Sequence, residues 1–289
     1  MSDAPASDTR SRPRFLLSLE LVAGSILTGS IVLLVLFSPL IFPDNGDTVN
    51  FLARLMPPFV DWTHPLGTDP LGKDVLARVV AGGRISLIVG VVSALGGVVI
   101  GTIMGLIAGY YRGIWDTILM RFADVQLALP FILLAITFIA IIGGGLVNMI
   151  ILMIVSQWVQ YARVVRGEVL SLRSREFVLA AKSFGVRDFW VLWHHILPNV
   201  TGPIIVLMTL NIAGNILLES SLTFLGLGID PLVPSWGGML SNGRNYLQTA
   251  WWMSLFPGLA IMITVLGLNL LGDWLRDYLD PRGQSIARK

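Results

Sequence analysis

Hydrophobic residues in this chain occur in long uninterrupted runs that are separated by shorter polar segments. A helix that crosses a membrane needs about 20 mostly apolar residues, whereas a transmembrane β-strand alternates polar and apolar positions over about ten. The continuous runs therefore predict an all-α integral membrane protein with six transmembrane helices. We expect these helices at Leu21–Phe42, Ile85–Tyr110, Val125–Ile142, Val147–Tyr161, Thr201–Leu227 and Trp251–Leu271.

The composition agrees with a membrane protein and excludes a soluble globular enzyme. Of the 289 residues, 54% are hydrophobic and 13% are charged, whereas about a quarter of an ordinary soluble domain is charged. The chain has no cysteine, which excludes disulfides, thiolate metal sites and a cysteine nucleophile. The three histidines, His64, His194 and His195, fall on opposite sides of the predicted membrane, so we expect no metal site.

The distribution of Lys and Arg predicts the direction of the helices. Alternate segments between the spans hold 15 basic residues on one side and 5 on the other. Basic residues favour the cytoplasm, so both termini are predicted to be cytoplasmic. This gives a cytoplasmic tail at 1–20, a first transmembrane helix at 21–42, an external loop at 43–84, a five-helix core at 85–272 with a cytoplasmic segment at 162–200, and a cytoplasmic tail at 273–289. The net charge of +2 is explained by these segments and does not indicate nucleic acid.

The cytoplasmic segment 162–200 has a helical pattern of its own. Apolar and small residues recur at helical spacing from Glu176, and Gly185 ends the run as a glycine at a helix C-terminus does. A second stretch, 188–196, leads to Leu197-Pro198, where we expect the proline to break the chain before the fifth span. The segment is either an amphipathic helix on the lipid surface or a docking helix for a cytoplasmic protein.

The same segment resembles a known signature. Ala180-Ala181, Gly185 and Leu197-Pro198 are similar to the EAA motif of permease subunits in bacterial ATP-binding cassette (ABC) importers. Leu179 stands where the motif often has Glu, and His195 where it often has an aliphatic residue. The resemblance implies that a coupling helix contacts a partner ATPase. The residues that it assigns to this contact are Arg175, Glu176, Ala180, Ala181, Gly185, Leu197 and Pro198; Arg173, Arg175 and Lys182 would pair with acidic groups there.

Further blocks between residues 64 and 281 resemble the C-type permease of dipeptide, oligopeptide and nickel importers. They are 64–69, 71–74, 195–199, 222–228, 234–237 and 269–281. The resemblance implies the type I ABC importer permease fold in the bacterial inner membrane. It also implies three kinds of partner, namely a second permease that forms a heterodimer, two ABC ATPase subunits or a fused pair, and an extracytoplasmic solute-binding protein.

Residues Gly67–Asp74 nearly match the phosphate-binding loop GxxxxGK[ST]. Asp74 replaces the hydroxyl that should reach Mg²⁺ and would repel phosphate, no predicted strand precedes the loop, and the loop falls on the external side. We therefore expect a structural loop here and no catalytic or cofactor site in this chain. ATP and Mg²⁺ are expected on the partner subunits.

Small residues lie four apart on the second span, at Ser93, Gly97, Gly101, Gly105 and Gly109. They form a ridge on one helix face that permits close approach of another helix. The ridge is either a static packing surface or a surface on which helices slide during opening and closing.

Polar residues also lie four apart on the fifth span, at Asn211, Asn215, Glu219 and Thr223. An ionisable residue inside a membrane is costly unless it faces water or a partner, so this stripe is our candidate lining of the translocation path. The alternative is hydrogen bonding that holds helices together. Gln126, Gln157 and Gln160 are weaker candidates of the same kind.

We expect a permease subunit that moves di- or oligopeptides inward with ATP hydrolysed by partners. A nickel chelate or another small solute stays open as the substrate. A secondary transporter or channel that works alone would ordinarily show repeated halves and interrupted midplane helices, and we find no such repeat. A membrane scaffold without transport is the third alternative, and for it the polar stripe would be dispensable.

Overall fold

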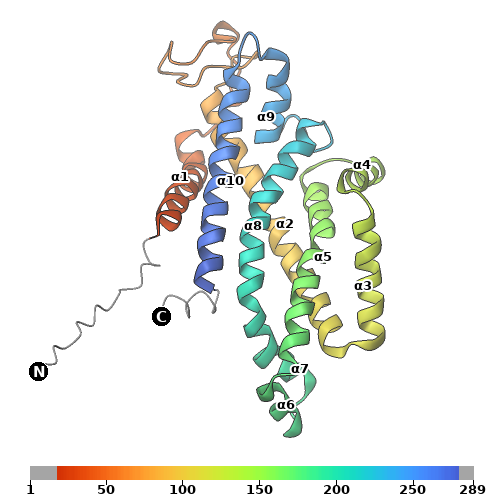
Figure 1. Ribbon diagram of the computed structural model, residues 1–289. Coiled ribbons are helices and arrows are strands. Elements are labelled where there is room, and N and C mark those ends of the chain that lie inside the picture. Colours follow the sequence, from red (N-terminus) through yellow and green to blue (C-terminus); the bar gives the residue numbers. More distant parts are fainter. Residues whose placement is uncertain (1–17, 280–289) are drawn as a thin grey trace, which may run out of the picture.

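The computed structural model describes residues 18–279 (Figure 1). Its long helices are α1 (Leu19–Ile41), α2 (Val75–Tyr111), α5 (Leu146–Leu172), α8 (Leu197–Phe224) and α10 (Trp252–Leu279). The shorter ones are α3 (Gly113–Ala128), α4 (Phe131–Ile142), α6 (Glu176–Ser183), α7 (Asp188–Val191) and α9 (Trp236–Gly243), with 3₁₀ turns at Phe51–Ala53 and Arg244–Tyr246 and a π turn at Leu192–Ile196. Most of the predicted tail 1–20 and the end of the tail 273–289 lie outside the described residues.

The molecule has two distinct ends. We call the end that carries α6 and α7 the lower end and the end that carries segment 43–74 and α9 the upper end, as they stand in Figure 1. Five helices are long and apolar enough to cross a membrane, or six if α3 and α4 count as one bent span. The all-helical membrane class is therefore confirmed, while the cytoplasmic placement of the termini stays a prediction.

The prediction of one continuous third span at Val125–Ile142 was wrong. The first residues of that range end α3, the rest form α4, and the two helices meet at 93°. Pro130 gives the reason, because a proline disfavours the helical conformation in the residue before it. Leu129 accordingly has an extended backbone, with φ −89° and ψ 125°.

Two other helices begin earlier than the hydropathy pattern predicted. Helix α2 starts at Val75 and not at Ile85, because the Asp74 side chain accepts a hydrogen bond from the Ala77 amide at 2.7 Å and caps the helix.

The predicted break at Pro198 was also wrong, since one helix runs from Asp188 to Phe224. The π turn before the proline, in which the Leu197 amide bonds to the Leu192 carbonyl, widens the helix where the proline ring enters.

Helix α2 is the central element of the bundle. It makes its most extensive contacts with α5 and α8 and also packs on α1, α3, α9 and α10. Helices α1 and α3 lie at opposite sides of the molecule (Figure 1), and their outward side chains are largely apolar and exposed. Such faces fit lipid or another membrane chain better than water.

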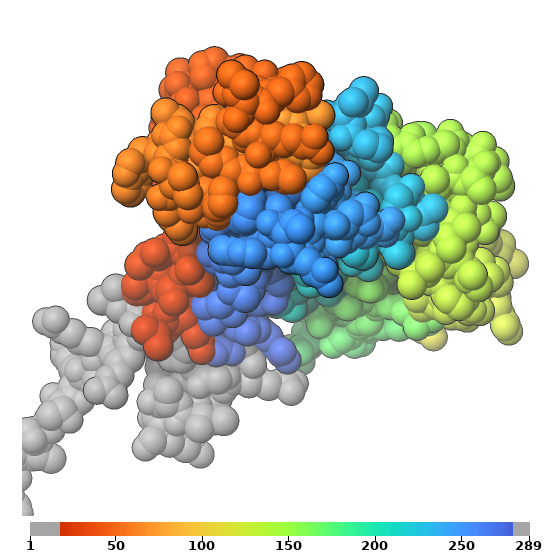
Figure 2. Space-filling model, turned by 90° about the horizontal axis from the view of Figure 1, so that it is seen from above, coloured from red at the N-terminus to blue at the C-terminus, as the bar shows by residue number. Residues whose placement is uncertain are grey.

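Segment 43–74 folds over the upper end and lies at one side of it, away from α3 and α4 (Figure 2). The near match to a phosphate-binding loop serves a structural purpose within it. Asp74 caps α2 and accepts a 2.8 Å contact from His64 Nδ1, while Asp69 pairs with Arg78 at 2.9 Å. Gly72 has a φ of +75° and packs directly against the Asn50 backbone, where a side chain does not fit.

Candidate coupling surface and transport groove

The coupling segment at the lower end consists of α6, α7 and the π turn. Arg175 has an extended backbone before α6, and Gly185 has a φ of +76° after it. A left-handed residue at this position is the common way to end a helix. The prediction that Gly185 terminates a helix beginning at Glu176 is therefore confirmed.

A buried apolar cluster seats this segment on the transmembrane helices. Val178 of α6, Val191 of α7 and Ile196 of the π turn are fully buried, and they pack with Tyr110 of α2 and Val165 of α5. The coupling segment is therefore part of the body of the protein and not a loose loop. A displacement of α6 must move, or break away from, the ends of α2 and α5.

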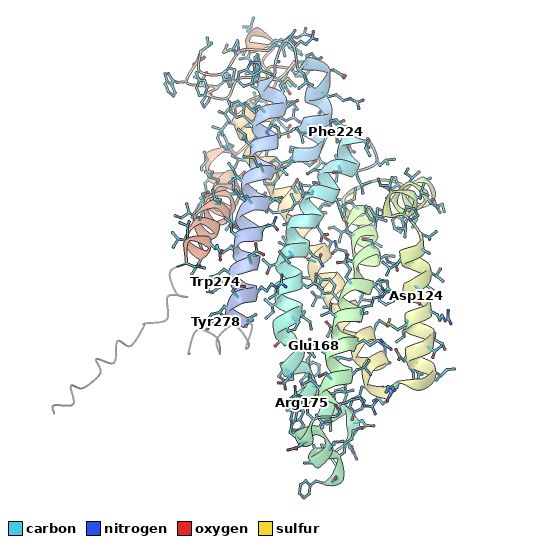
Figure 3. All side chains as sticks on the ribbon, in the orientation of Figure 1. Asp124, Glu168, Arg175, Phe224, Trp274 and Tyr278 are labelled. Atoms are coloured by element: carbon cyan, nitrogen blue, oxygen red, sulfur yellow. The ribbon has the colours of Figure 1, made fainter. Side chains whose placement is uncertain are left out.

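The seven residues that the resemblance assigned to ATPase contact divide between two faces. Five are exposed, namely Arg175, Glu176, Ala180, Gly185 and Pro198. The other two, Ala181 and Leu197, pack against the buried cluster. Figure 3 places Arg175 at the lower end of the molecule, below Glu168 of α5 in that view. We call the exposed five the coupling surface.

Two of the cations expected to face a partner contact this chain itself. Arg173 donates to the carbonyl oxygen of Tyr110 at 3.0 Å, and the Lys182 ammonium lies 4.4 Å from the centre of the Tyr110 ring. Arg175 and Lys182 are both exposed, while Arg173 is partly buried. The pairing of all three with acidic groups of a partner stays a prediction.

The glycine ridge of α2 lies against α5. A Cβ atom added at Gly101 would come within 2.5 Å of the Trp158 carbonyl oxygen, and one added at Gly105 within 2.6 Å of the Ala162 carbonyl oxygen. At Gly97 it would approach the Tyr161 ring to 3.1 Å, and at Gly109 the Val169 Cβ to 2.8 Å. The two backbones are thus in contact along the ridge, which leaves no room for side chains.

We expect Gly101→Ala to destabilise the protein by about 1–3 kcal/mol, because the added methyl group forces α2 and α5 apart. The matched control is Gly29→Ala on α1, where nothing lies within 4 Å of the added atom. Alanine is intrinsically better in a helix than glycine by about 1 kcal/mol, so the control should lose nothing. Thermal unfolding in detergent measures both, and equal midpoints would contradict the close contact.

Two members of the polar stripe on α8, Asn215 and Glu219, bond to other helices, and a third, Thr223, bonds to Glu219 within α8. Asn215 is fully buried, donates to the Ser93 hydroxyl at 2.8 Å and also bonds to Gln157 of α5. Glu219 is fully buried and accepts hydrogen bonds from Ser86 of α2 at 3.0 Å and from Thr223 at 2.9 Å. This geometry favours the alternative of interhelical hydrogen bonding, and a path-lining role for these residues stays a prediction.

The fourth member, Asn211, opens into a groove of about 690 Å³ between α3, α4, α5 and α8. The polar side chains that line this transport groove are Gln126, Ser156, Gln157, Gln160 and Asn211. The structure thus brings together the three glutamines that were weaker candidates in the sequence. Sequence reasoning missed Ser156, although its position four residues before Gln160 places both on one helix face.

Thiol labelling tests whether the groove is open to water. The natural chain has no cysteine, so a single introduced thiol reports its own surroundings. We expect Asn211→Cys to react at least about tenfold faster with a membrane-impermeant reagent than Ala213→Cys, because thiol reactivity requires access to solvent. Ala213 lies on the same helix and is 1% exposed. Equal rates would contradict a water-accessible groove.

The described residues hold no group of three or more His, Asp or Glu side chains placed to bind a metal ion. His64 is bonded to Asp74 in segment 43–74, while His194 of the π turn stacks on Trp190 of α7. The coupling surface and the transport groove are the two candidate sites that the described residues present.

The fold matches that of a chain of a known ABC transporter. A chain of the MetNI methionine ABC transporter, solved in an inward-facing conformation, aligns with a TM-score of 0.56 and 18% identity, over 71% of this chain and 97% of that one. At this level of identity the likeness shows a shared fold. The family described as "Binding-protein-dependent transport system inner membrane component" matches residues 97–284.

Curated relatives agree over longer stretches. The dipeptide transport system permease of Alkalihalophilus pseudofirmus is 44% identical over 264 residues, 91% of this chain and 86% of the relative. The oligopeptide permease of Bacillus subtilis is 40% identical, over 90% and 85%. The glutathione permease of Pectobacterium atrosepticum is 45% identical, over 77% and 74%. This chain belongs to the family of binding-protein-dependent transport system inner membrane components, and it is a multi-pass integral membrane protein.

Proposed function

We propose that this chain is the permease subunit of an ABC importer that takes up short peptides, with energy from ATP hydrolysed by partner subunits. The observation that carries the proposal is the 44% identity over 91% of the chain to a dipeptide permease. The relatives that are named for oligopeptides and glutathione transport the same chemical class, since glutathione is itself a small peptide. Peptides as a class therefore have more support than a nickel chelate.

The partners follow from the two ends of the molecule. We infer that the lower end is cytoplasmic, because six basic residues lie in segment 162–200, and that its coupling surface docks on one of two ABC ATPase subunits, separate or fused. ATP and Mg²⁺ bind to those subunits. The upper end, with segment 43–74 and α9, faces an extracytoplasmic solute-binding protein, and the whole complex lies in the bacterial inner membrane.

We propose that a second, homologous permease covers the transport groove and closes it into a passage. Two features support this arrangement. The groove joins polar side chains with exposed apolar ones such as Leu129, and α3 and α4 beside it present mostly apolar surface. An exposed polar side chain of the groove such as Gln160 would lack hydrogen-bond partners if it faced lipid, which costs several kcal/mol.

Deletion of the gene and complementation test the substrate class. If the proposal holds, the deletion strain loses growth on a dipeptide that supplies a required amino acid, and the intact gene restores it. The free amino acid is the control, since its uptake should not change. Normal peptide-dependent growth together with loss of nickel uptake would contradict the proposal and favour the metal-chelate alternative.

A further inference from the structure

Tyr110, near the lower end of α2, contacts three other elements through different parts of the residue. Its hydroxyl donates to Asp188 Oδ1 of α7 at 2.5 Å, and its ring faces the Lys182 ammonium of α6 at 4.4 Å. Its carbonyl oxygen accepts from Arg173, just after α5, at 3.0 Å. Lys182 Nζ also lies 3.7 Å from Asp188 Oδ1. We call these four residues the tyrosine node.

The node differs in kind from the apolar cluster beneath it. Apolar burial holds the coupling segment on the helices without a directional preference, so the segment can tilt or slide on that seat. Hydrogen bonds and ring-to-cation contacts lose strength when angle or distance changes. Tyr110 is 3% exposed, whereas the side chains of Lys182 and Asp188 are 37% and 52% exposed, so water reaches these contacts only from the side of the two charged groups. The node therefore fixes the orientation of α6 and α7 relative to α2.

Helix α2 connects the tyrosine node to the upper end of the molecule. It contacts α5 through the glycine ridge, and Ser86, close to its upper end, bonds to Glu219 of α8. The Ser86 hydroxyl also accepts the Trp236 amide of α9 at 3.4 Å. A rotation of α6 that the node passes to α2 therefore reaches helices at both the groove and the upper end.

We propose that Tyr110 is a positioning residue that transmits movement of the coupling segment to the transmembrane helices. The proposal rests on the proposed function, since it requires an ATPase that moves α6. In this proposal the Asp188 carboxylate and the Lys182 ammonium hold the Tyr110 side chain from two sides. The Tyr110 hydroxyl group makes the contact with Asp188 directional. Loss of the hydroxyl leaves the segment seated but lets it move without α2.

The test is Tyr110→Phe in the complete complex reconstituted in proteoliposomes. This change keeps the ring and its packing but removes the bond to Asp188. A hydrogen bond to a charged group contributes more than tenfold to an equilibrium, so we expect uptake per ATP hydrolysed to fall about tenfold, with the ATPases still bound. The matched control is Tyr111→Phe, at the adjacent tyrosine that is 51% exposed, which should behave as wild type.

Lys182→Met is a second, independent test of the proposal. Its side chain is 37% exposed, so the variant should fold, and it loses both the ring contact and the pairing with Asp188. We expect the same direction of change, and we expect Tyr110→Phe combined with Asp188→Ala to cost no more than Asp188→Ala alone, because the bond that Tyr110→Phe removes is already lost in that variant. Normal uptake per ATP in Tyr110→Phe and Lys182→Met, even with less assembled complex, would overturn the proposal. A wild-type complex without ATP-driven uptake would instead overturn the proposed function.

Discussion

Replacing Ala180 with arginine is expected to lower ATP-driven uptake by at least about a hundredfold, because a long charged side chain in a tight interface leaves an unpaired, desolvated charge. Ala180 lies on the exposed face of α6, whereas Val178 and Ala181 of the same helix face the buried apolar cluster. Substitutions at exposed positions usually change folding stability by less than about 0.5 kcal/mol. The chain should therefore insert and fold normally while losing its ATPase partner.

Co-purification of the ATPases with a tagged permease measures this loss directly. The informative comparison is Ala181→Arg, because Ala181 packs on the buried cluster beneath α6. That variant should lower the amount of folded permease itself, since an arginine does not fit there without exposing or unpairing its charge. Gly185→Trp should uncouple as Ala180→Arg does, with added strain from the positive φ. ATPase binding and uptake at wild-type levels in Ala180→Arg would contradict the coupling surface.

Replacing Glu219 with leucine is expected to destabilise the protein by about 2–4 kcal/mol, because buried hydroxyl groups lose their acceptor. The hydroxyls are those of Ser86, Ser220 and Thr223, which all donate to the Glu219 carboxyl group. Each of them can turn to a carbonyl of its own helix, which keeps the cost below the sum of separate losses. The bond between Ser86 of α2 and Glu219 of α8 would be lost, and the Ser86 hydroxyl, which also accepts the amide of Trp236 at the start of α9, would no longer be held in place.

Thermal unfolding and uptake, measured on the same preparations, separate the two interpretations of this residue. Glu219→Gln keeps an acceptor of the same shape, so it should cost about 1 kcal/mol or less and retain uptake per folded molecule. Ser221→Leu is the control, as it lies on the exposed side of α8. If Glu219→Gln abolished uptake without changing stability, the carboxylate would belong to the path and not to the packing.

The hydropathy pattern was sufficient for the all-helical membrane class, because apolar runs of spanning length have few alternative structures. It placed helix boundaries poorly where polar signals decide them. Asp74 starts α2 ten residues before the apolar run that marked the span, and Pro130 divides a run that is apolar on both sides. A π turn that carries a helix past Pro198 leaves no signature in the sequence.

For the candidate sites too, the sequence predicted correctly what helical spacing alone decides, and it gave no answer where the packing of the helices decides. Helical spacing correctly placed Asn215 and Glu219 on one face of α8, but it gave no information about which helix that face meets. The groove joins Gln126 and Asn211, which are far apart in the sequence. Likewise, spacing identified Ala180 and Ala181 together, while only the position of the buried cluster shows that one faces outward and the other inward.

The central claim is that this chain couples ATP hydrolysed by partner subunits to peptide import. Uptake of a labelled dipeptide into proteoliposomes that hold the whole complex tests it most directly, with wild type and Ala180→Arg compared with and without ATP on the side of the coupling surface. We predict uptake that requires ATP and the solute-binding protein in wild type and is absent in Ala180→Arg. Uptake by this chain alone, without ATP, would contradict the claim.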